Sequence, residues 1–315
     1  MAYAIFYYSI VLIYVLPKVL LPNEAVSIEN IKNPIIWIVE FIFIKDAMHL
    51  KILVYWLMCM SFMFIVMSFS KEKTIEVSKT KKKDLIYLFG GRISVPKIIY
   101  RKFFHIMAVI MFVPVTIQRP LFMCLSYAVA ICLFLLIESF RVQFITEHEV
   151  NSLARALHFY IKQFTDSRDS GTFILTHIYL LIGCMIPTCV EIFSHEKTIN
   201  YHRILSGVMI LGIGDTMASV VGFNFGKTKW NYPIDTKKSV EGTFASFLSV
   251  CFISYLVVPI HFTSNLELCS YIFCTLAASM LEAYTVQIDN LILPVFFYTL
   301  LCAFSTIQSH LFTIL

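Results

Sequence analysis

Long apolar runs are the feature of this sequence that most limits how the chain can fold. Stretches of about 20 residues with few charges recur along its 315 residues, and each is long enough to cross the roughly 30 Å hydrocarbon core of a bilayer. Only 14% of the residues are charged and 58% are hydrophobic, against about 25% charged in an ordinary soluble domain. This composition excludes a soluble globular enzyme, a disordered protein and a nucleic-acid-binding protein. It predicts an all-α fold, namely a polytopic helical membrane protein.

We expect about nine transmembrane helices. The first run lacks the basic start and the small-residue cleavage site of a signal peptide, so we expect it to be retained as a span. The predicted spans are 3–21, 51–69, 103–118, 120–137, 171–190, 204–225, 242–260, 268–286 and 291–311.

Basic residues predict the orientation of these spans. The segment 70–102 holds ten Lys and Arg residues, whereas 261–267 holds none. Because loops rich in Lys and Arg stay in the cytoplasm, 70–102 is predicted to be cytoplasmic, together with 138–170 and 226–241. The N-terminus is then cytoplasmic and the C-terminus lies outside. We interpret the Lys-rich stretch 71–83 as a solvated segment that faces anionic lipid.

The nine cysteines lie mostly inside the apolar runs, and none forms a C-x-x-C pair. Free cysteine is a common buried small hydrophobe. We therefore interpret these residues as packing side chains rather than as disulfide partners or metal ligands.

Asp215 lies inside an apolar span, where a carboxylate costs about 2.5–3.5 kcal/mol and therefore indicates a functional site. Gly214, Ala218 and Gly222 are spaced by four, which lets another helix approach closely. Two interpretations stay open. Gly212 and Gly214 could end one half-helix so that Asp215 caps the next and backbone N–H groups point at an anion. Alternatively, they are packing glycines beside a hydrogen-bonded aspartate.

The segment that follows this span combines lysines, glycines, hydroxyls and an acid at the start of a helix, which suits phosphate binding. The spacing is not that of a Walker A loop. The alternative is a basic cytoplasmic loop in which Glu241 favours the helix dipole. The candidate nucleotide-binding residues are Gly226, Lys227, Trp230, Lys237, Lys238, Ser239, Glu241, Gly242 and Thr243.

Further acids lie near the ends of two other spans. Asp166 and Asp169 precede a span that carries His177, and they could act as a base or bind a metal, or cap the helix. Glu282 and Asp289 are seven residues apart, so we expect them to share one helix face near the cytoplasmic end. The alternative for this pair is a polar helix end that faces the bundle.

Arg101 and His105 are four residues apart where another span begins. His105 could carry a proton, or it could have a structural or headgroup-binding role. The predicted topology places all these polar clusters on one side of the membrane. That arrangement suits an enzyme that joins a water-soluble, phosphate-bearing donor to a lipid acceptor.

Five runs of residues, in this order, resemble dolichol kinases, and they span about two thirds of the chain. They are Arg101–His105, Asp166–Leu181, Gly214–Ser219, Lys237–Thr243 and Leu281–Asn290. The resemblance implies a multi-pass enzyme of the endoplasmic reticulum membrane with its active site facing the cytoplasm. Such an enzyme transfers the γ-phosphate of CTP to the terminal hydroxyl of dolichol, which gives dolichyl phosphate for protein glycosylation.

The resemblance and the residues together suggest a role for each candidate. The nucleotide loop would bind the CTP phosphates, and Asp169 would take the hydroxyl proton, with Asp166 and His177 as alternatives. Asp215 is assigned as a catalytic residue, and dolichol is expected to enter along the small-residue face of span 204–225. The expected ligands of a divalent cation, Mg²⁺, are Asp215, Glu241, Glu282 and Asp289.

We expect three regions: an N-terminal transmembrane region at 1–70 that is short for the family, a basic cytoplasmic loop at 71–100, and a dolichol-kinase-like catalytic membrane domain at 101–315. The expected partners are dolichol and membrane lipid, with no nucleic acid, and a homodimer is left open. Three alternatives stay open. They are a related CTP-dependent polyprenol or phytol kinase or lipid cytidylyltransferase, a secondary transporter, and a shortened chain without activity.

Overall fold

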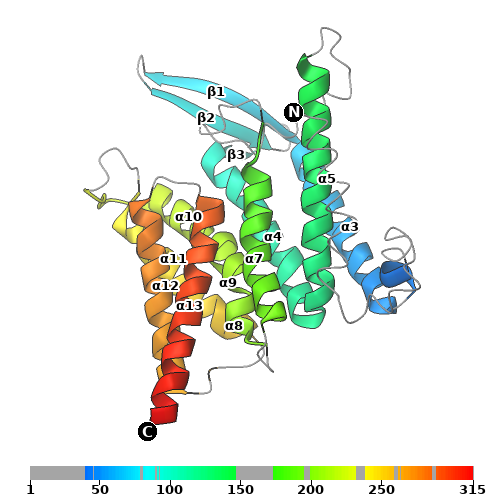
Figure 1. The fold of residues 1–315 in the computed structure, drawn as a ribbon. Helices are drawn as coiled ribbons and strands as arrows, with labels where there is room; N and C mark the ends of the chain where they lie inside the picture. The colour runs from blue at the N-terminus through cyan, green and yellow to red at the C-terminus, as the bar shows by residue number, and fades with distance from the viewer. Residues whose placement is uncertain are drawn as a thin grey trace.

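The computed structural model describes residues 40–44, 46–78, 81–88, 91, 93–146, 173–194, 199–231, 238–258, 262, 264–285 and 289–314. In this part of the chain, eight helical segments are long and apolar enough to cross a membrane. They correspond in order to the last eight predicted spans, which are thereby confirmed in place, and the predicted span 3–21 lies outside the described residues. The chain is a polytopic helical membrane protein (Figure 1).

Seven of these segments are single helices. They are α3 (Ala47–Ser68), α4 (Lys97–Gln118), α5 (Pro120–Thr146), α7 (Thr176–Phe193), α11 (Val240–Val257), α12 (Asn265–Tyr284) and α13 (Asp289–Ile314). The eighth is a composite of α8 (Tyr201–Ile204), α9 (Ser206–Val208), the π-helical turn η3 (Met209–Gly214) and α10 (Asp215–Phe225).

The bundle differs from a soluble domain in exposing large apolar side chains on its outer surface. Leu57 and Met58 of α3 are each 68% exposed and Phe252 of α11 is 62% exposed, whereas Ser246 and Thr275 are fully buried. Many large apolar side chains therefore face outward, and small hydroxyl residues lie between the helices together with the apolar core. This is the expected arrangement when the surroundings are lipid and helices associate through close packing and hydrogen bonds.

The composite segment runs through the middle of the bundle, where it contacts α4, α7, α11 and α13. Ile204, Leu205 and Ile210 are fully buried. The segment is helical through Asp215, whose backbone angles are φ −64° and ψ −30°. The half-helix interpretation is therefore wrong: η3 passes directly into α10, and Asp215 is a residue of a continuous helix rather than a cap.

The small-residue face of α10 packs against α11. A Cβ atom on Gly242 of α11 would lie 2.7 Å from the carbonyl oxygen of Ala218 and 3.2 Å from the Cα of Gly222. A Cβ atom on Gly214 would lie 2.9 Å from Oγ of Ser246. The prediction that another helix packs closely on this face is confirmed, and that helix is α11. The expectation that dolichol enters along this face is wrong because a helix already covers it.

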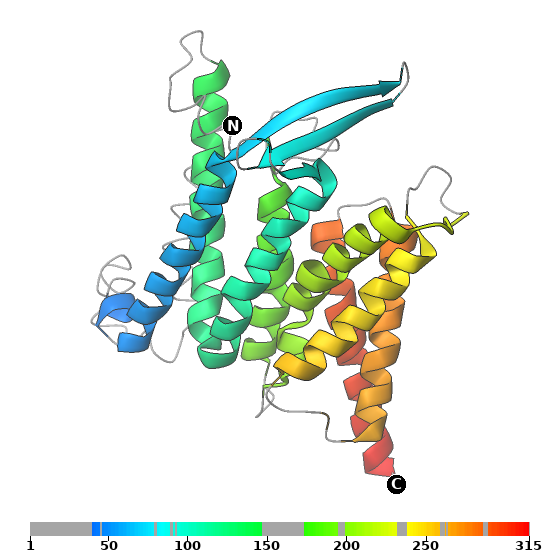
Figure 2. The same ribbon diagram turned by 180° about the vertical axis from the view of Figure 1, so that it is seen from behind.

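The basic segment before α4 forms a three-stranded antiparallel sheet of β1 (Ser70–Ser78), β2 (Lys81–Leu88) and β3 (Ile93–Pro96), in the order β1-β2-β3. The register pairs Glu76 with Lys82 and Leu88 with Ile93. The sheet lies at one end of the bundle, and α4 follows β3 directly (Figures 1 and 2). The sequence predicts only a loop here, because β1 and β2 are rich in lysine and β2 is a charged run followed by an apolar run rather than the strict alternation typical of strands.

Candidate functional site

Asp215 forms a buried ion pair with α4. Lys102 donates from Nζ to Oδ2 of Asp215 at 2.5 Å, and both side chains are about one-tenth exposed. One turn further along α4, Nδ1 of His105 lies 3.3 Å from the same oxygen and 3.2 Å from the carbonyl oxygen of Leu211. The carboxylate is thus held by a lysine and a histidine from one helix. A buried charge needs such partners to be tolerated.

Glycine allows η3 to come close enough to α4 for this contact. A Cβ atom on Gly212 would lie 2.1 Å from Cγ2 of Val109 and 3.2 Å from the carbonyl oxygen of His105. No side chain larger than hydrogen fits there without moving α4. The glycine before Asp215 therefore has a packing role, as the second sequence interpretation proposed.

A second lysine joins the ends of α12 and α13. Nζ of Lys238 donates to the backbone carbonyl oxygen of Glu282 and lies 3.9 Å from Oε1 of the same residue. It also lies 3.6 Å from Oδ2 of Asp289 and 3.5 Å from the carbonyl oxygen of Thr285. The Lys238 side chain is 23% exposed. Oε2 of Glu282 is buried and has no hydrogen-bond partner.

Glu282 and Asp289 do not share a helix face, so this prediction is wrong. The first helix ends at Tyr284 and the next begins at Asp289, with Thr285 in extended conformation after the first. The two acids come together because Lys238 lies between them.

The two lysine clusters form one electrostatic network. Lys238 interacts electrostatically with Asp215, and Asp215 and Lys102 interact with Glu282. We call the five residues Lys102, Asp215, Lys238, Glu282 and Asp289 the charged network. It contains two cations and three acids, contributed by α4, α10, the segment before α11, α12 and α13.

The segment between α10 and α11 folds tightly over the start of α11. Oε1 of Glu241 accepts hydrogen bonds from the backbone N–H of Lys227 and of Thr228, at 3.1 and 2.9 Å. Oγ of Ser239 accepts from the N–H of Gly242 and caps α11. Glu241 thus holds the backbone of the loop.

Two aromatic side chains connect this loop to the end of α12. Nε1 of Trp230 donates to Oγ1 of Thr243 at 3.0 Å, and the Trp230 ring lies against Tyr284 with ring centroids 5.1 Å apart. A Cβ atom on Gly226 would lie 2.5 Å from Oγ of Ser239, so this position requires glycine. These contacts hold the loop beside Lys238 and beside the end of α12, where Glu282 lies.

The structure brings most of the predicted site residues to one end of the bundle. Asp215, Lys238, Glu282 and Asp289 belong to the charged network, and the other described candidates of 226–243 form the loop beside it. The ring of His177 lies against Phe134 of α5, with centroids 4.8 Å apart. Asp166, Asp169 and Lys237 lie outside the described residues.

Lys102 is absent from the predicted site residues, and the sequence analysis leaves His105 open between a proton carrier and a structural or headgroup-binding role. The signal that could have found Lys102 is a lysine within an apolar helix, which is as costly as the aspartate that was selected. Its partner is 113 residues away in the sequence, so no local pattern shows the pair.

The residues fit a Mg²⁺ ion that arrives with phosphate. Within the described part of the chain, no three His, Cys, Asp or Glu side chains are grouped closely enough to hold a metal by themselves. Mg²⁺ is commonly bound by one or two carboxylates together with substrate phosphates, so a complete protein cage is not required. The orphaned, buried Oε2 of Glu282 is an oxygen that such an ion could use.

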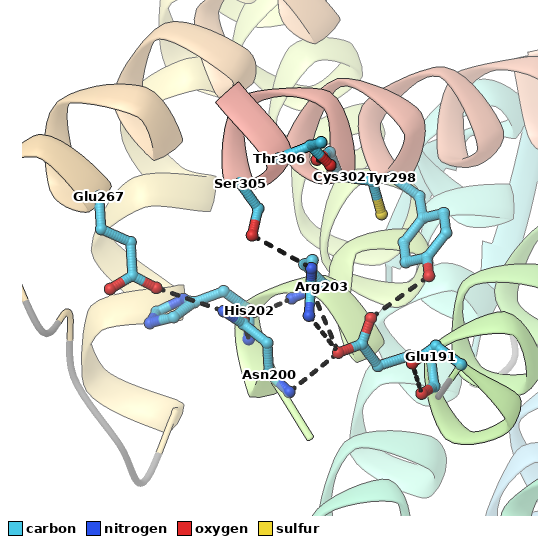
Figure 3. Close-up of polar contacts among 10 residues, drawn as sticks. Glu191, Asn200, His202, Arg203, Glu267, Tyr298, Cys302, Ser305 and Thr306 are labelled. Carbon is cyan, nitrogen blue, oxygen red and sulfur yellow. Dashed lines mark hydrogen bonds and ion pairs between the residues drawn. The ribbon is translucent and has the colours of Figure 1, made fainter. Parts of the chain in front are cut away.

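A second buried polar cluster, drawn in Figure 3, lies where α7, α8 and α13 meet, and α8 is at the end of the bundle opposite the sheet (Figure 1). Oε1 of Glu191 accepts from Nε and Nη2 of Arg203, at 3.2 and 3.0 Å, and from the backbone N–H of Asn200 at 3.0 Å. Its Oε2 accepts from the hydroxyl of Tyr298 at 3.3 Å, and Arg203 also donates to Ser305. Both oxygens of this carboxylate have partners, so the cluster joins α7, α8 and α13 without an open position.

The sequence was compared with known proteins. The family model for dolichol kinase matches residues 1–267. The dolichol kinase EVAN of Arabidopsis thaliana is 33% identical over 275 residues, which are 86% of this chain and 43% of that protein. The dolichol kinase of Homo sapiens is 31% identical over 284 residues, or 86% of this chain and 48% of that protein.

The dolichol kinase sec59 of Schizosaccharomyces pombe is 28% identical over 300 residues, covering 94% of this chain and 55% of that protein. The chain thus spans about half the length of the curated relatives it matches. No solved structure matches it significantly. The family model covers well over half of the chain. The chain belongs to the dolichol kinase family.

Proposed function

We propose that this chain transfers the γ-phosphate of CTP to the terminal hydroxyl of dolichol, forming dolichyl phosphate and CDP. The observation that carries the proposal is the charged network, in which two lysines and three acids from four helices and the segment before α11 converge at the basic end of a membrane bundle. Family membership supports dolichol as the acceptor. We propose CTP as the donor on the resemblance of the loop 226–243 to the nucleotide-binding stretch of the family.

Transfer of a phosphoryl group depends mainly on positioning and on neutralising charge. The hydroxyl oxygen of dolichol bonds to the γ-phosphorus while the bond from that phosphorus to the β,γ-bridging oxygen breaks. CDP leaves, and the hydroxyl proton passes to a base. We propose Asp169 as this base, with Asp166 and His177 as the alternatives.

The lysines would bind the phosphates. Lys238 is 23% exposed, and in this structure its ammonium group is held by two backbone carbonyl oxygens and two acids. Lys102 is more buried and fixes Asp215. We therefore propose that Lys238 meets the nucleotide and that Lys102 orients Asp215.

Asp215, Glu282 and Asp289 would hold a Mg²⁺ ion, which when bound neutralises charge on the transferring phosphates. We propose that Glu241 has a different task from the one first assigned to it. It keeps the loop in place by accepting two backbone N–H groups, at Lys227 and Thr228.

We also propose that the site faces the cytoplasm of an endoplasmic reticulum membrane. The sheet β1-β2-β3, formed by the most basic segment of the chain, is followed directly by the helix that carries Lys102. Positive loops stay on the cytoplasmic side, so the network would be accessible to cytoplasmic nucleotide.

A label-transfer assay tests the proposal. Purified chain in lipid-containing micelles receives Mg²⁺, dolichol and CTP labelled at either the γ- or the α-phosphate, with labelled ATP and phytol in parallel. We expect label in dolichyl phosphate from γ-labelled CTP alone. Label transferred from α-labelled CTP would instead show cytidylyl transfer, and preferential labelling of phytol would show a different acceptor. Absence of transfer to either lipid would overturn the proposal for this chain.

A further inference from the structure

Two cysteines from different helices lie in contact at the end of the bundle away from the charged network. Sγ of Cys189 in α7 lies 2.9 Å from Sγ of Cys124 in α5, although the residues are 65 positions apart. This separation is only about 1 Å longer than the S–S bond of about 2 Å. The sulfur atoms therefore already face each other, and a small side-chain movement would bring them to bonding distance.

The supporting helices hold this arrangement. The two helices pack against each other and lie side by side in both views (Figures 1 and 2). Cys124 is four residues after the start of α5 at Pro120, and Cys189 is four residues before the end of α7 at Phe193. At 1.5 Å per residue, each thiol lies about 6 Å from its helix end. Both ends belong to the side opposite the basic sheet.

That side is the non-cytoplasmic one under the orientation proposed above, on which this inference rests. Disulfides form and persist in oxidising compartments such as the lumen of the endoplasmic reticulum. The thiols differ in access, because Cys124 is 1% exposed and Cys189 is partly exposed. An oxidant would therefore reach Cys189 first.

We propose that Cys124 and Cys189 form a disulfide that joins α5 to α7 at the lumenal end of the bundle. The oxidant is the disulfide of a lumenal thiol–disulfide oxidoreductase. The Cys189 thiolate attacks one sulfur of that disulfide, whose S–S bond breaks as a mixed disulfide forms. The Cys124 thiolate then attacks the Cys189 sulfur and releases the oxidoreductase. Two protons and two electrons pass from the thiols to the oxidant, which leaves as a dithiol.

The sequence analysis interpreted all nine cysteines as packing residues, because no spacing in the chain indicates a pair. The two cysteines lie 65 positions apart on different helices, so only the packing of α5 against α7 reveals the contact. The bond would fix α5 against α7 two residues before Glu191, and it would lie away from the charged network.

The experiment counts oxidised thiols in the full chain from intact membranes. Membranes are dissolved in SDS with excess N-ethylmaleimide, so that burial protects no thiol, and excess reagent is removed. The protein is then treated with or without a reductant and labelled with a polyethylene-glycol maleimide. We expect a gel shift of two adducts that appears only after reduction, together with a reductant-sensitive Cys124–Cys189 linked peptide in mass spectrometry.

Three serine variants assign the pair. Cys124→Ser and Cys189→Ser should each abolish the reductant-dependent shift, whereas Cys184→Ser, a buried cysteine on the same helix, should keep it. Complete alkylation of all nine cysteines in the unreduced wild-type protein would overturn the proposal. So would a linked peptide that joins a different pair. Because the wild-type measurement needs no variant, it stands even if a serine variant fails to fold.

Discussion

Two of the clusters of buried charge, the charged network and the one around Glu191, lie at opposite ends of the bundle and differ in how completely their acids are satisfied. At the end away from the basic sheet, both oxygens of Glu191 accept hydrogen bonds, and the Arg203 side chain is 7% exposed. In the charged network, Oε2 of Glu282 is buried without a partner, and the Lys238 side chain is 23% exposed. One cluster is complete and closed, whereas the other is incomplete and reachable from water.

This difference shows that buried charge alone does not identify a binding site. A fully satisfied ion pair costs desolvation energy and holds helices together, but it offers no position to a ligand. A native structure rarely leaves a buried carboxylate oxygen without a partner, so an orphaned oxygen needs an explanation. We interpret it as the position that a ligand completes.

The largest expected effect is that of Asp215→Asn. This change removes the acid that Lys102 holds at 2.5 Å and that we propose as a Mg²⁺ ligand. We expect transfer to fall about 1,000-fold, the lower range reported for groups that stabilise charge in phosphoryl transfer. The measurement is label transfer per folded molecule, with folded protein quantified by size-exclusion chromatography in detergent.

A double variant separates chemistry from folding. Asp215→Asn leaves Lys102 buried without its anion, which is itself destabilising. Combining it with Lys102→Met removes both charges, so the folded fraction should recover while transfer stays low. Activity within a few-fold of wild type in Asp215→Asn would exclude Asp215 from the site.

Substitution in the cluster around Glu191 should lower the stability of the protein and leave its activity unchanged. Glu191→Gln leaves Arg203 buried without a negative partner, so we expect the free energy of unfolding to fall by about 3 kcal/mol. Transfer per folded molecule should stay unchanged, because this cluster lies at the far end from the charged network. Thermal unfolding in detergent measures the first quantity and the label-transfer assay the second. A variant of normal stability and reduced turnover would reverse the assignment of the two ends.

Lys238→Ala should have an intermediate effect, mainly on nucleotide affinity. Removing a partly exposed ammonium group that meets phosphate should raise the KM for CTP about tenfold, equivalent to about 1.4 kcal/mol, with a smaller change in kcat. Lys229→Ala is the matched control, because Lys229 is an exposed lysine of the same loop and should change KM less than about twofold. Equal effects of the two substitutions would indicate general attraction rather than a specific contact.

Sequence reasoning located the membrane helices because one physical requirement, about 20 apolar residues per crossing, acts on each helix separately. It missed the sheet at 70–96, whose lysine-rich strands lack a clear alternation of polar and apolar residues. It also failed where separate helices meet. Lys102 reaches Asp215 across 113 residues, and Glu282 meets Asp289 only because a helix ends at Tyr284.

For the same reason, the types of residue in the site could be predicted better than their contacts. Asp215 and Lys238 were selected because charged groups are costly near an apolar bundle and phosphate attracts lysine. Lys102, the partner of Asp215, was left out, whereas Glu282 and Asp289, which meet Lys238, were among the predicted residues. Glu241 was grouped with the metal ligands on charge alone, although its Oε1 already accepts two backbone N–H groups.

Glu241 combines features of both clusters, because one of its oxygens is satisfied and the other is not. Its substitution should have the smallest effect on activity. Its Oε1 holds the loop, while its Oε2 is buried without a hydrogen-bond partner. If holding the loop is the main role, Glu241→Gln keeps an acceptor oxygen and should change the KM for CTP by less than about fivefold, or about 1 kcal/mol. Glu241→Ala leaves the N–H groups of Lys227 and Thr228 without their acceptor and should raise KM further.

The order of the two variants is the informative result, and steady-state kinetics at several Mg²⁺ concentrations measures it. A graded increase in KM from glutamine to alanine, with unchanged Mg²⁺ dependence, would place Glu241 with the satisfied acids. If glutamine instead lowers kcat as strongly as alanine does and shifts the Mg²⁺ requirement, Oε2 is a metal ligand. The orphaned oxygens of Glu241 and Glu282 would then belong to one binding position, and the incomplete cluster would extend into the loop.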